Sequence, residues 1–281
     1  MNAGHASTLA KLANHDWSAP WWQPWASNGM QLADLVASGL PTSSALNAMV
    51  AMQASAHASA SQSALGESHA AHAQRPLFVP QSAMPAGAHY EDYIFSSKQC
   101  PIRGDMHDFF NGLVWLQFPQ TKTRINQLQA GEIAANGVRS TRGPLRDALT
   151  LFDESAALLH CPDALWQALL AKDWHKLFID LRPLWQQAQL LVFGHAVLEK
   201  LVSPYKSVIV SVVRSSIAMD NIANLDAHMA QWLCREQLVP KPFAPMPLLG
   251  VPGWWAANAE PAFYADERVF RKPTIPIAKY P

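Results

Sequence analysis

The sequence predicts a mainly helical (α+β) fold, with a single helical domain over residues 1–281, one small β-hairpin, and extended terminal arms rich in Pro and Trp. Three observations predict it. Apolar residues recur with the helical period of about 3.6 through much of the middle of the chain. Two segments begin and end with residues typical of helix termini. Nine of the 21 prolines lie from residue 240 onward, where regular elements are disfavoured.

The composition excludes several classes of protein. The 281 residues are 49% hydrophobic and only 15% charged, and the formal net charge is zero. A disordered chain or a highly charged coiled coil would carry more charge than this. The neutral balance also argues against a uniformly basic nucleic-acid coat.

The cysteines and the apolar runs predict a cytoplasmic protein without membrane contact. The three cysteines, Cys100, Cys161 and Cys234, are an odd number and contain no CxxC pair, so we expect reduced thiols. No segment at the start resembles a signal peptide. The longest apolar stretch, 190–202, is interrupted by polar residues and is shorter than the roughly 20 residues of a spanning helix.

The N-terminal third is predicted to contain an arm, a helix and a low-complexity segment. Residues 1–30 form a Trp-rich arm that we expect to lie over the main body. Residues 31–50 fit a short helix with a break at Pro41. Residues 51–73 are an Ala/Ser/His tract that fits either a weakly packed helix or a loop. The tryptophans of the arm are Trp17, Trp21, Trp22 and Trp25.

Two helices with clear boundaries are predicted after a short extended segment at 77–80 and a second element at 90–95. The first helix covers 106–117, with Asp105 as its N-cap and a stop at Phe118-Pro119. The second covers about 119–129 and begins with proline in its first turn.

The C-terminal half is predicted to start with a small hairpin at 149–159, whose turn would be Asp153-Glu154. Further helices are expected at about 162–171, 181–202, 204–219 and 222–236. The Val208–Val210 run is β-branched and also fits a strand, but the cap-like Ser203-Pro204 favours a helix. Residues 240–281 are predicted to be a Pro-rich strap.

The first candidate site lies on the apolar helix 106–117. His107 and Asn111 are four residues apart and therefore share one face. A buried imidazole and carboxamide must be hydrogen-bonded or bound to a metal. The pair fits either a functional site or a polar cluster that only stabilises the fold.

The second candidate site is His195 and Glu199, which also share one face of a predicted helix. A neutral imidazole and a carboxylate suit Zn, Mn or Fe. They also suit a pair in which the carboxylate fixes the histidine tautomer. The preceding Gly194 permits another backbone to approach closely.

A basic stretch between residues 119 and 146 could contact an anion. Its cations are opposed by Glu132 alone, and the Arg142-Gly143-Pro144 turn could present a guanidinium to an oxyanion. A solvated face fits the same residues. The cations of the stretch are Lys122, Arg124, Arg139, Arg142 and Arg146.

The order of these segments resembles a bacterial family known only as a domain of unknown function. The resemblance rests on His107-Asp-Phe-Phe-Asn111, Trp115, Phe118-Pro119 and Thr121-Lys122. Further matching segments are Phe78–Gln81, Tyr90-Glu91, Arg142–Glu154 and Phe193–Lys200, so the match runs over about residues 76–205. The resemblance implies a cytoplasmic bacterial protein and groups the polar pairs with the Arg-Gly-Pro turn. Ser155-Ala156 departs from the family pattern.

Two functions remain open from the sequence. There is no dinucleotide, P-loop, serine-hydrolase, zincin or CxxC motif. One hypothesis is a hydrolase that uses a divalent metal on a small anionic, phosphate-containing substrate. The other is a non-catalytic protein that docks a partner protein or, less favoured, RNA through its basic turn and aromatic arms.

For the hydrolase, the polar pairs are expected to converge in one cleft. The catalytic candidates are His107, Asn111, His195 and Glu199, the metal ligands among them are His107, His195 and Glu199, and the substrate contacts are Lys122, Arg142 and Arg146.

Overall fold

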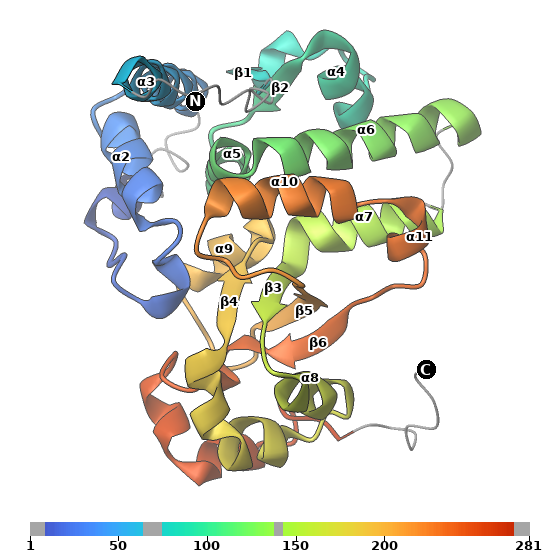
Figure 1. Cartoon of the computed structure of the whole chain (residues 1–281). Helices are drawn as coiled ribbons and strands as arrows, with labels where there is room; N and C mark the ends of the chain where they lie inside the picture. Colours follow the sequence, from blue (N-terminus) through green and yellow to red (C-terminus); the bar gives the residue numbers. More distant parts are fainter. Residues whose placement is uncertain (1–8, 64–74, 138–142, 273–281) are drawn as a thin grey trace. The chain divides into compact units, whose positions relative to one another are not determined.

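A computed structural model describes residues 9–63, 75–137 and 143–272 of the chain (Figure 1). Within these ranges helices predominate over strands, which confirms the mainly helical α+β class. The chain separates into two compact units, which are described in turn. Unit 1 comprises Met1–Trp17, Trp25–Leu149 and Ile222–Pro240; unit 2 comprises Ser18–Pro24, Thr150–Asn221 and Lys241–Pro281. A single domain over 1–281 stays a prediction.

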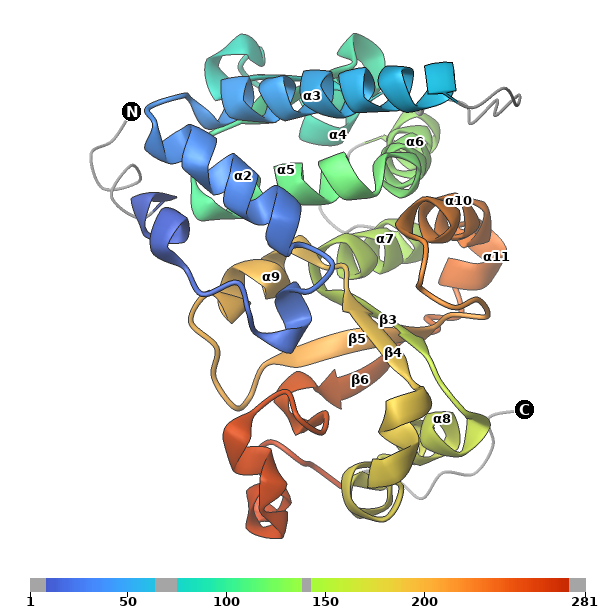
Figure 2. The same cartoon turned by 60° about the vertical axis from the view of Figure 1, so that its left-hand side comes forward.

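Unit 1 is built mainly from helices. In both views α6 and α10 run beside one another, and α5 lies at a steep angle to both (Figures 1 and 2). A short parallel pair of strands, β1 and β2, completes the unit. Its elements are η1 Ala10–Asn14, α2 Ala26–Ala37, α3 Thr42–Ser63, β1 Leu77–Pro80, η3 Gln81–Ala83, α4 Tyr90–Ser97, β2 Gln99–Ile102, α5 Met106–Gln117, α6 Pro119–Asn136, α10 Ile222–Trp232 and α11 Arg235–Leu238.

Helix α5 forms where the sequence predicts it, and for the predicted reason. The Asp105 side chain accepts a hydrogen bond of 2.8 Å from the Asp108 backbone N–H, so it caps the first turn. The middle of α5 is buried on every side, and a Cβ at Gly112 would lie only 2.4 Å from the Leu46 side chain. Helices α3 and α5 therefore pack closely at this glycine.

Strand β1 is held by a side chain as well as by its partner strand. Asn47 of α3 donates to the Phe78 carbonyl at 2.8 Å and accepts from the Phe78 N–H at 3.0 Å. The carboxamide thus pairs with the strand backbone as a neighbouring strand would, and it satisfies polar groups that a two-stranded sheet leaves open. The extended segment predicted at 77–80 is confirmed.

The first turn of α6 is capped from a distant helix. Pro119 stands at the first position of α6, and Phe118, its N-cap, offers no side-chain hydrogen bond. The two oxygens of Asp226, on α10, accept from the N–H groups of Gln120 at 2.9 Å and Thr121 at 2.8 Å. The Thr121 hydroxyl donates to the Asp226 carbonyl at 3.1 Å. A carboxylate at a helix N-terminus also opposes the positive end of the helix dipole.

Unit 2 is built on a four-stranded mixed sheet of order β4-β3-β5-β6 (Figure 2). Strand β3 pairs parallel with β5 and antiparallel with β4, and β6 lies antiparallel on β5. The longest segment of the unit begins inside α7 Pro144–Ser155, whose first residues belong to unit 1. Its other elements are η2 Pro20–Trp22, β3 Ala156–His160, α8 Asp163–Leu170, η4 Lys176–Asp180, η5 Arg182–Gln187, β4 Gln189–Val192, α9 His195–Leu201, β5 Ile209–Arg214, β6 Ala244–Pro247, η6 Leu248–Gly250, η7 Ala256–Ala259 and η8 Pro261–Ala265.

The predicted hairpin at 149–159 is wrong. Helix α7 continues to Ser155, and strand β3 starts directly after it. The helix forms because its apolar residues follow the helical spacing, and the buried positions are Leu145, Ala148, Leu149 and Phe152. Asp153 and Glu154 therefore lie in the last turn of a helix and do not make a hairpin turn.

The predicted helix at 204–219 is also wrong, since residues 209–214 form β5. Val210 and Val212 are buried, while Ile209 and Ser211 on the opposite face are more exposed, so the first four residues alternate as in a strand. β-branched residues suit this pleated surface. The helix predicted at 181–202 is divided as well, into η5, β4 and α9.

The helix boundaries elsewhere differ less from the predictions. The helix expected at 31–50 is two helices, α2 and α3, separated at Pro41, and α3 continues into the Ala/Ser/His tract as far as Ser63. The rest of that tract, residues 64–74, lies outside the described residues. The predicted helix at 119–129 extends to Asn136. The helix at 222–236 ends at Trp232 and is followed by the short α11.

The aromatic residues of both arms are largely buried, as expected. All four tryptophans of the N-terminal arm are less than 8% exposed. The C-terminal segment is more regular than the predicted strap, because it supplies strand β6. The Asn258 side chain donates to the carbonyls of Leu249 and Val251, which fixes the turns after β6.

No helix among the described residues is both long and apolar enough to cross a membrane.

We predict that Asp226→Ala lowers the free energy of unfolding by about 1–3 kcal/mol, since two N–H groups of α6 lose a charged acceptor. Asp34→Ala, at an exposed position of α2, is the control and should change it by less than about 0.5 kcal/mol. Denaturant unfolding followed by circular dichroism measures both. Equal effects of the two substitutions would show that the cap contributes nothing.

Burial raises the pKa of Asp226 above its ordinary 3.8, in spite of the N–H groups that favour the ionised form. A raised pKa in the folded state means that the folded protein holds this proton more tightly than the unfolded chain does. The stability of the wild type relative to Asp226→Asn should therefore fall as the pH rises from about 3.8. Unfolding curves at several pH values above 3.8 would test this, and a rising difference would contradict it.

Candidate functional site

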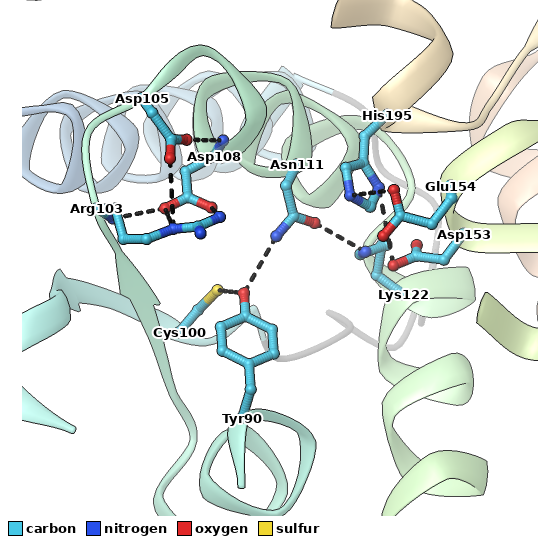
Figure 3. Close-up of polar contacts among 10 residues, drawn as sticks. All are labelled: Tyr90, Cys100, Arg103, Asp105, Asp108, Asn111, Lys122, Asp153, Glu154 and His195. Atoms are coloured by element: carbon cyan, nitrogen blue, oxygen red, sulfur yellow. Dashed lines mark hydrogen bonds and ion pairs between the residues drawn. The ribbon is translucent and has the colours of Figure 1, made fainter. Parts of the chain in front are cut away.

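Unit 1 contains a buried chain of polar side chains that joins α4, β2, α5 and α6 (Figure 3). The Lys122 ammonium donates to Asn111 Oδ1 at 2.9 Å, and Asn111 Nδ2 donates to the Tyr90 hydroxyl at 3.1 Å. The Tyr90 hydroxyl lies 3.3 Å from the Cys100 thiol. Asn111 and Lys122 are about 5% exposed, so these two candidates from the sequence lie together in the core of this unit. Their functional role stays a prediction.

The surroundings of this chain suppress ionisation of its neutral groups. Burial raises the pKa of Cys100 to about 12, although its hydrogen bond with Tyr90 and the nearby Lys122 charge act in the opposite direction. Burial also raises the pKa of Tyr90 well above its ordinary value. The Lys122 ammonium lies 5.5 Å from the centre of the Trp115 ring, within reach of a cation–π attraction. The thiol and the phenol therefore stay protonated near pH 7.

Two ion pairs hold the segment before α5. Arg103 donates to Asp108 through two of its guanidinium nitrogens, Nε and Nη2, each at 3.1 Å, and the Arg103 backbone N–H also donates to the same carboxylate. Asp105 lies 3.4 Å from the guanidinium (Figure 3). Asp108 is 3% exposed, so its charge is compensated where it is buried.

Unit 2 contains the second cluster, in which one histidine lies between two carboxylates. His195 Nε2 is 3.4 Å from a carboxylate oxygen of Glu154, and His195 Nδ1 is 3.8 Å from one of Asp153 (Figure 3). The His195 side chain is 3% exposed, against 16% for Asp153 and 39% for Glu154. The imidazole is thus buried, while the Glu154 carboxylate reaches solvent.

A glycine brings the two elements of this cluster together. Gly194 precedes α9, and a Cβ at this position would lie 2.4–2.5 Å from backbone atoms of Glu154 and Ser155. No other residue fits there without displacing backbone. The N–H groups of Phe193 and Gly194 both donate to the Ala156 carbonyl at 2.9 Å. The end of α7 and the start of α9 are therefore fixed against each other within unit 2.

The distances in this cluster suit a metal ligand pair. Two ligand atoms bound to tetrahedral zinc at about 2.1 Å lie about 3.4 Å apart. The Nε2–Glu154 distance is 3.4 Å. Histidines that bind a metal commonly direct their other nitrogen to a carboxylate, which is the position of Asp153 beside Nδ1. The same geometry suits a protonated His195 paired with two carboxylates.

The remaining predicted site residues are placed as follows. His107 lies half-buried in the first turn of α5, one turn before Asn111. Glu199 lies on α9, one turn after His195. Arg146 lies in the first turn of α7, and its Nε is buried with no hydrogen-bond partner among the described residues. Arg142 is outside the described residues. The convergence of the two polar pairs stays a prediction.

Sequence analysis missed the carboxylates beside His195 because Asp153 and Glu154 were assigned to a turn. The buried face of α7 could have shown that they end a helix. Tyr90 and Cys100 were not candidates either. Tyr90 does belong to a segment on which the family resemblance rests, but nothing in the sequence alone brings it to Asn111.

A model of a protein family described as "Protein of unknown function (DUF3025)" matches residues 77–274. The match covers more than half of the chain, so the protein belongs to this family. No curated protein and no solved structure matches the chain.

We expect alkylation of the native protein at pH 8 to modify Cys234 first. The pKa of Cys100 is raised to about 12 and that of Cys161 to about 11 by burial, so very little of either thiol is ionised at this pH. Cys234 is only half-buried. Iodoacetamide labelling followed by peptide mass spectrometry measures the order, and the unfolded chain, in which all three should react, is the control. Early labelling of Cys100 would contradict the buried chain.

The substitution Asn111→Leu should lower the free energy of unfolding by about 1–3 kcal/mol, because the Lys122 ammonium and the Tyr90 hydroxyl each lose a buried partner. Asn28→Leu is the comparison, since the Asn28 carboxamide also bonds a side chain, that of Gln117, but at a position that is less buried. Thermal and denaturant melts measure both, and a larger loss for Asn28→Leu would argue against the buried chain as a stabilising element.

Proposed function

We propose that the protein is a metal-dependent hydrolase and that its metal is bound at the His195 cluster. The observation that supports this most is the 3.4 Å separation of His195 Nε2 and the Glu154 carboxylate, with Asp153 beside the opposite nitrogen. Imidazole and carboxylate are ligands that Zn, Mn and Fe accept.

In this proposal each side chain of the cluster has a separate task. His195 Nε2 and Glu154 are ligands. Asp153 is a positioning residue that acts through its charge, since its carboxylate lies 3.8 Å from Nδ1, which is longer than a hydrogen bond. The 39% exposure of Glu154 leaves one side of the ligand pair open to solvent, as a catalytic metal requires. His107 and Glu199 remain the further ligands predicted from the sequence.

A metal held by His195 and Glu154 would supply a water activated for attack on a phosphate ester. The overall hydrolysis would consume one water and give the phosphate and the free alcohol, so no other reactant is needed.

An anionic, phosphate-containing substrate is part of the proposal. Its predicted contacts are Lys122, Arg142 and Arg146. The buried Arg146 Nε, which has no hydrogen-bond partner in the described part of the chain, supports a role in contacting an anion. Lys122 supports it less, because its ammonium already donates to Asn111.

The docking alternative has less support. It needs the basic stretch to face solvent, but Lys122 is buried and the Arg124 side chain donates to the Leu233 carbonyl at 3.0 Å. Its one acid, Glu132, forms an ion pair with Arg235 of α11. Cations that are used within the fold contribute little to salt-dependent binding of RNA.

A cytoplasmic location also belongs to this proposal. It is supported by the free thiols of the three cysteines. A bacterial origin rests on the sequence resemblance.

We expect the purified protein, loaded with Zn²⁺ or Mn²⁺ and dialysed, to retain one metal ion per chain by mass spectrometry. His195→Ala and Glu154→Gln should each weaken metal binding at least tenfold, since each removes one of few ligands. His175→Ala is the matched control, because His175 also pairs with a carboxylate, Asp180 at 3.3 Å, but is 70% exposed.

Hydrolysis of p-nitrophenyl phosphate should depend on the bound metal. The activity should be lost in EDTA and recovered when Zn²⁺ or Mn²⁺ is added back. His107→Ala and Glu199→Ala in the same two assays test the ligands predicted from the sequence. If the wild type binds no metal, or if His195→Ala binds it as well as the wild type with its fold intact, the cluster is a structural ion pair and the proposal fails.

A further inference from the structure

Unit 2 contains a cavity of about 350 Å³ that shares no lining residue with the His195 cluster. Its volume is in the range of small-ligand sites. Three of its lining residues are cations and none is an acid. They are Lys172, Arg268 and Arg271.

The floor of the cavity is apolar and comes from the sheet. Ile209 of β5 faces Pro247 of β6 in the strand register, and Pro245 lies two residues earlier on the same side of β6. Ile209, the first residue of β5, is 43% exposed although its side chain is large and aliphatic. The lining of the cavity thus combines an exposed apolar side chain with three cations.

One wall of the cavity is rigid. The Trp174 indole N–H donates to the Arg271 carbonyl at 2.8 Å, and its ring stacks on Phe178. Phe270, beside Arg271, is 3% exposed and packs edge-on against Trp174. The segment that carries Arg268 and Arg271 is therefore held in place without a ligand, which lowers the entropic cost of binding one.

The charges on the rim are only partly neutralised. Arg268 forms a two-bond pair with Asp266, and this pairing together with Lys206 holds the pKa of Asp266 at about 2. Arg271 donates from Nε to the Arg268 carbonyl. No acid lines the cavity, so no carboxylate of the lining neutralises the charge of the Arg271 guanidinium. Lys172 adds a further positive charge.

Lys172 occupies a backbone position that favours glycine. Helix α8 ends in a Schellman motif, in which the Asp173 N–H donates to the Ala168 carbonyl and the Lys172 N–H to the Leu169 carbonyl. The residue in the left-handed conformation is Lys172, with φ of 50°. The same motif ends α2 with Gly39, whose φ is 100°. A strained non-glycine residue at the rim of a cavity suggests that its side chain is needed there.

We propose that this cavity binds a small organic anion, with the anionic head on Lys172 and Arg271 and the apolar body over Trp174 and Ile209. The head is a phosphate or a carboxylate, since the two share the charge that the rim cations attract. The body is a flat ring or a short chain that fits about 350 Å³.

Isothermal titration calorimetry with phenylphosphonate tests this, because its carbon–phosphorus bond resists hydrolysis. EDTA in the buffer keeps any metal at His195 from contributing, so this test is independent of the proposed function. One molecule should bind per chain, and inorganic phosphate and phenol, which supply only the head or only the body, should bind at least tenfold more weakly. Benzoate compares the two head groups, and the tighter of the two identifies the head.

Lys172→Gly separates binding from stability. It removes the strain of a positive φ, so its melting temperature should equal or exceed that of the wild type, while phenylphosphonate should bind about tenfold more weakly or worse. The matched control is Lys98→Gly, which removes one charge and a similar strain, φ of 58°, at the end of α4 in unit 1. Its affinity for phenylphosphonate should be unchanged.

Ile209→Ser tests the floor. It should weaken the binding of phenylphosphonate but leave that of inorganic phosphate unchanged. The proposal is overturned if phenylphosphonate does not bind the wild type at millimolar concentration, if Lys172→Gly binds it as the wild type does, or if Lys98→Gly weakens it equally.

Discussion

Helix α6 starts without a capping side chain of its own, and most of the polar core of unit 1 depends on how that start is fixed. Asp226 accepts from two N–H groups in the first turn, and Thr121 returns a hydrogen bond to the Asp226 backbone. The turn fixed in this way carries Lys122, whose ammonium reaches Asn111 on α5. Further along α6, Asn126 donates to the backbone and side chain of Glu91 on α4. A shift of α6 would therefore break contacts with three other helices.

Unit 2 depends on a different constraint, the absence of a side chain at Gly194. Backbone atoms of Glu154 and Ser155 occupy the space that a Cβ would need. Because His195 directly follows Gly194 in the chain, its ring lies beside the last turn of α7, which contains Asp153 and Glu154. The carboxylates are thus positioned by backbone packing, and their separation from the imidazole does not depend on flexible loops.

The two polar clusters differ in what they can do chemically. In unit 1 most of the chain from Lys122 to Cys100 is buried, with Tyr90 half-buried, and burial raises the pKa of its thiol and phenol, so the chain suits a structural role. In unit 2 the burial is graded, from 3% exposure at His195 to 39% at Glu154. A ligand or a substrate could reach such a cluster from solvent. This difference is why the proposed metal is assigned to His195 and Glu154.

Local interactions allowed part of the structure to be predicted from the sequence. The Asp105 cap, the proline that opens α6 and the break at Pro41 each act within a few residues, so α5, the start of α6 and the division between α2 and α3 follow from the chain itself. Gly194 was also recognised for a local reason, because a residue without a side chain permits another backbone to approach closely.

Only the tertiary structure decided the elements whose partners are distant in the chain. The β-branched run at 208–213 fits a helix or a strand, and it is a strand because β3 and β6 supply its hydrogen bonds on both sides. Residues 149–155 form a helix because their apolar face is covered. For the same reason the sequence spacing could not reveal the carboxylates beside His195 or the residue that caps α6. Asp153 lies 42 residues before His195, and Asp226 lies more than 100 residues after Gln120. These residues are brought together by backbone packing and by backbone N–H groups that need an acceptor, and no local sequence pattern indicates either.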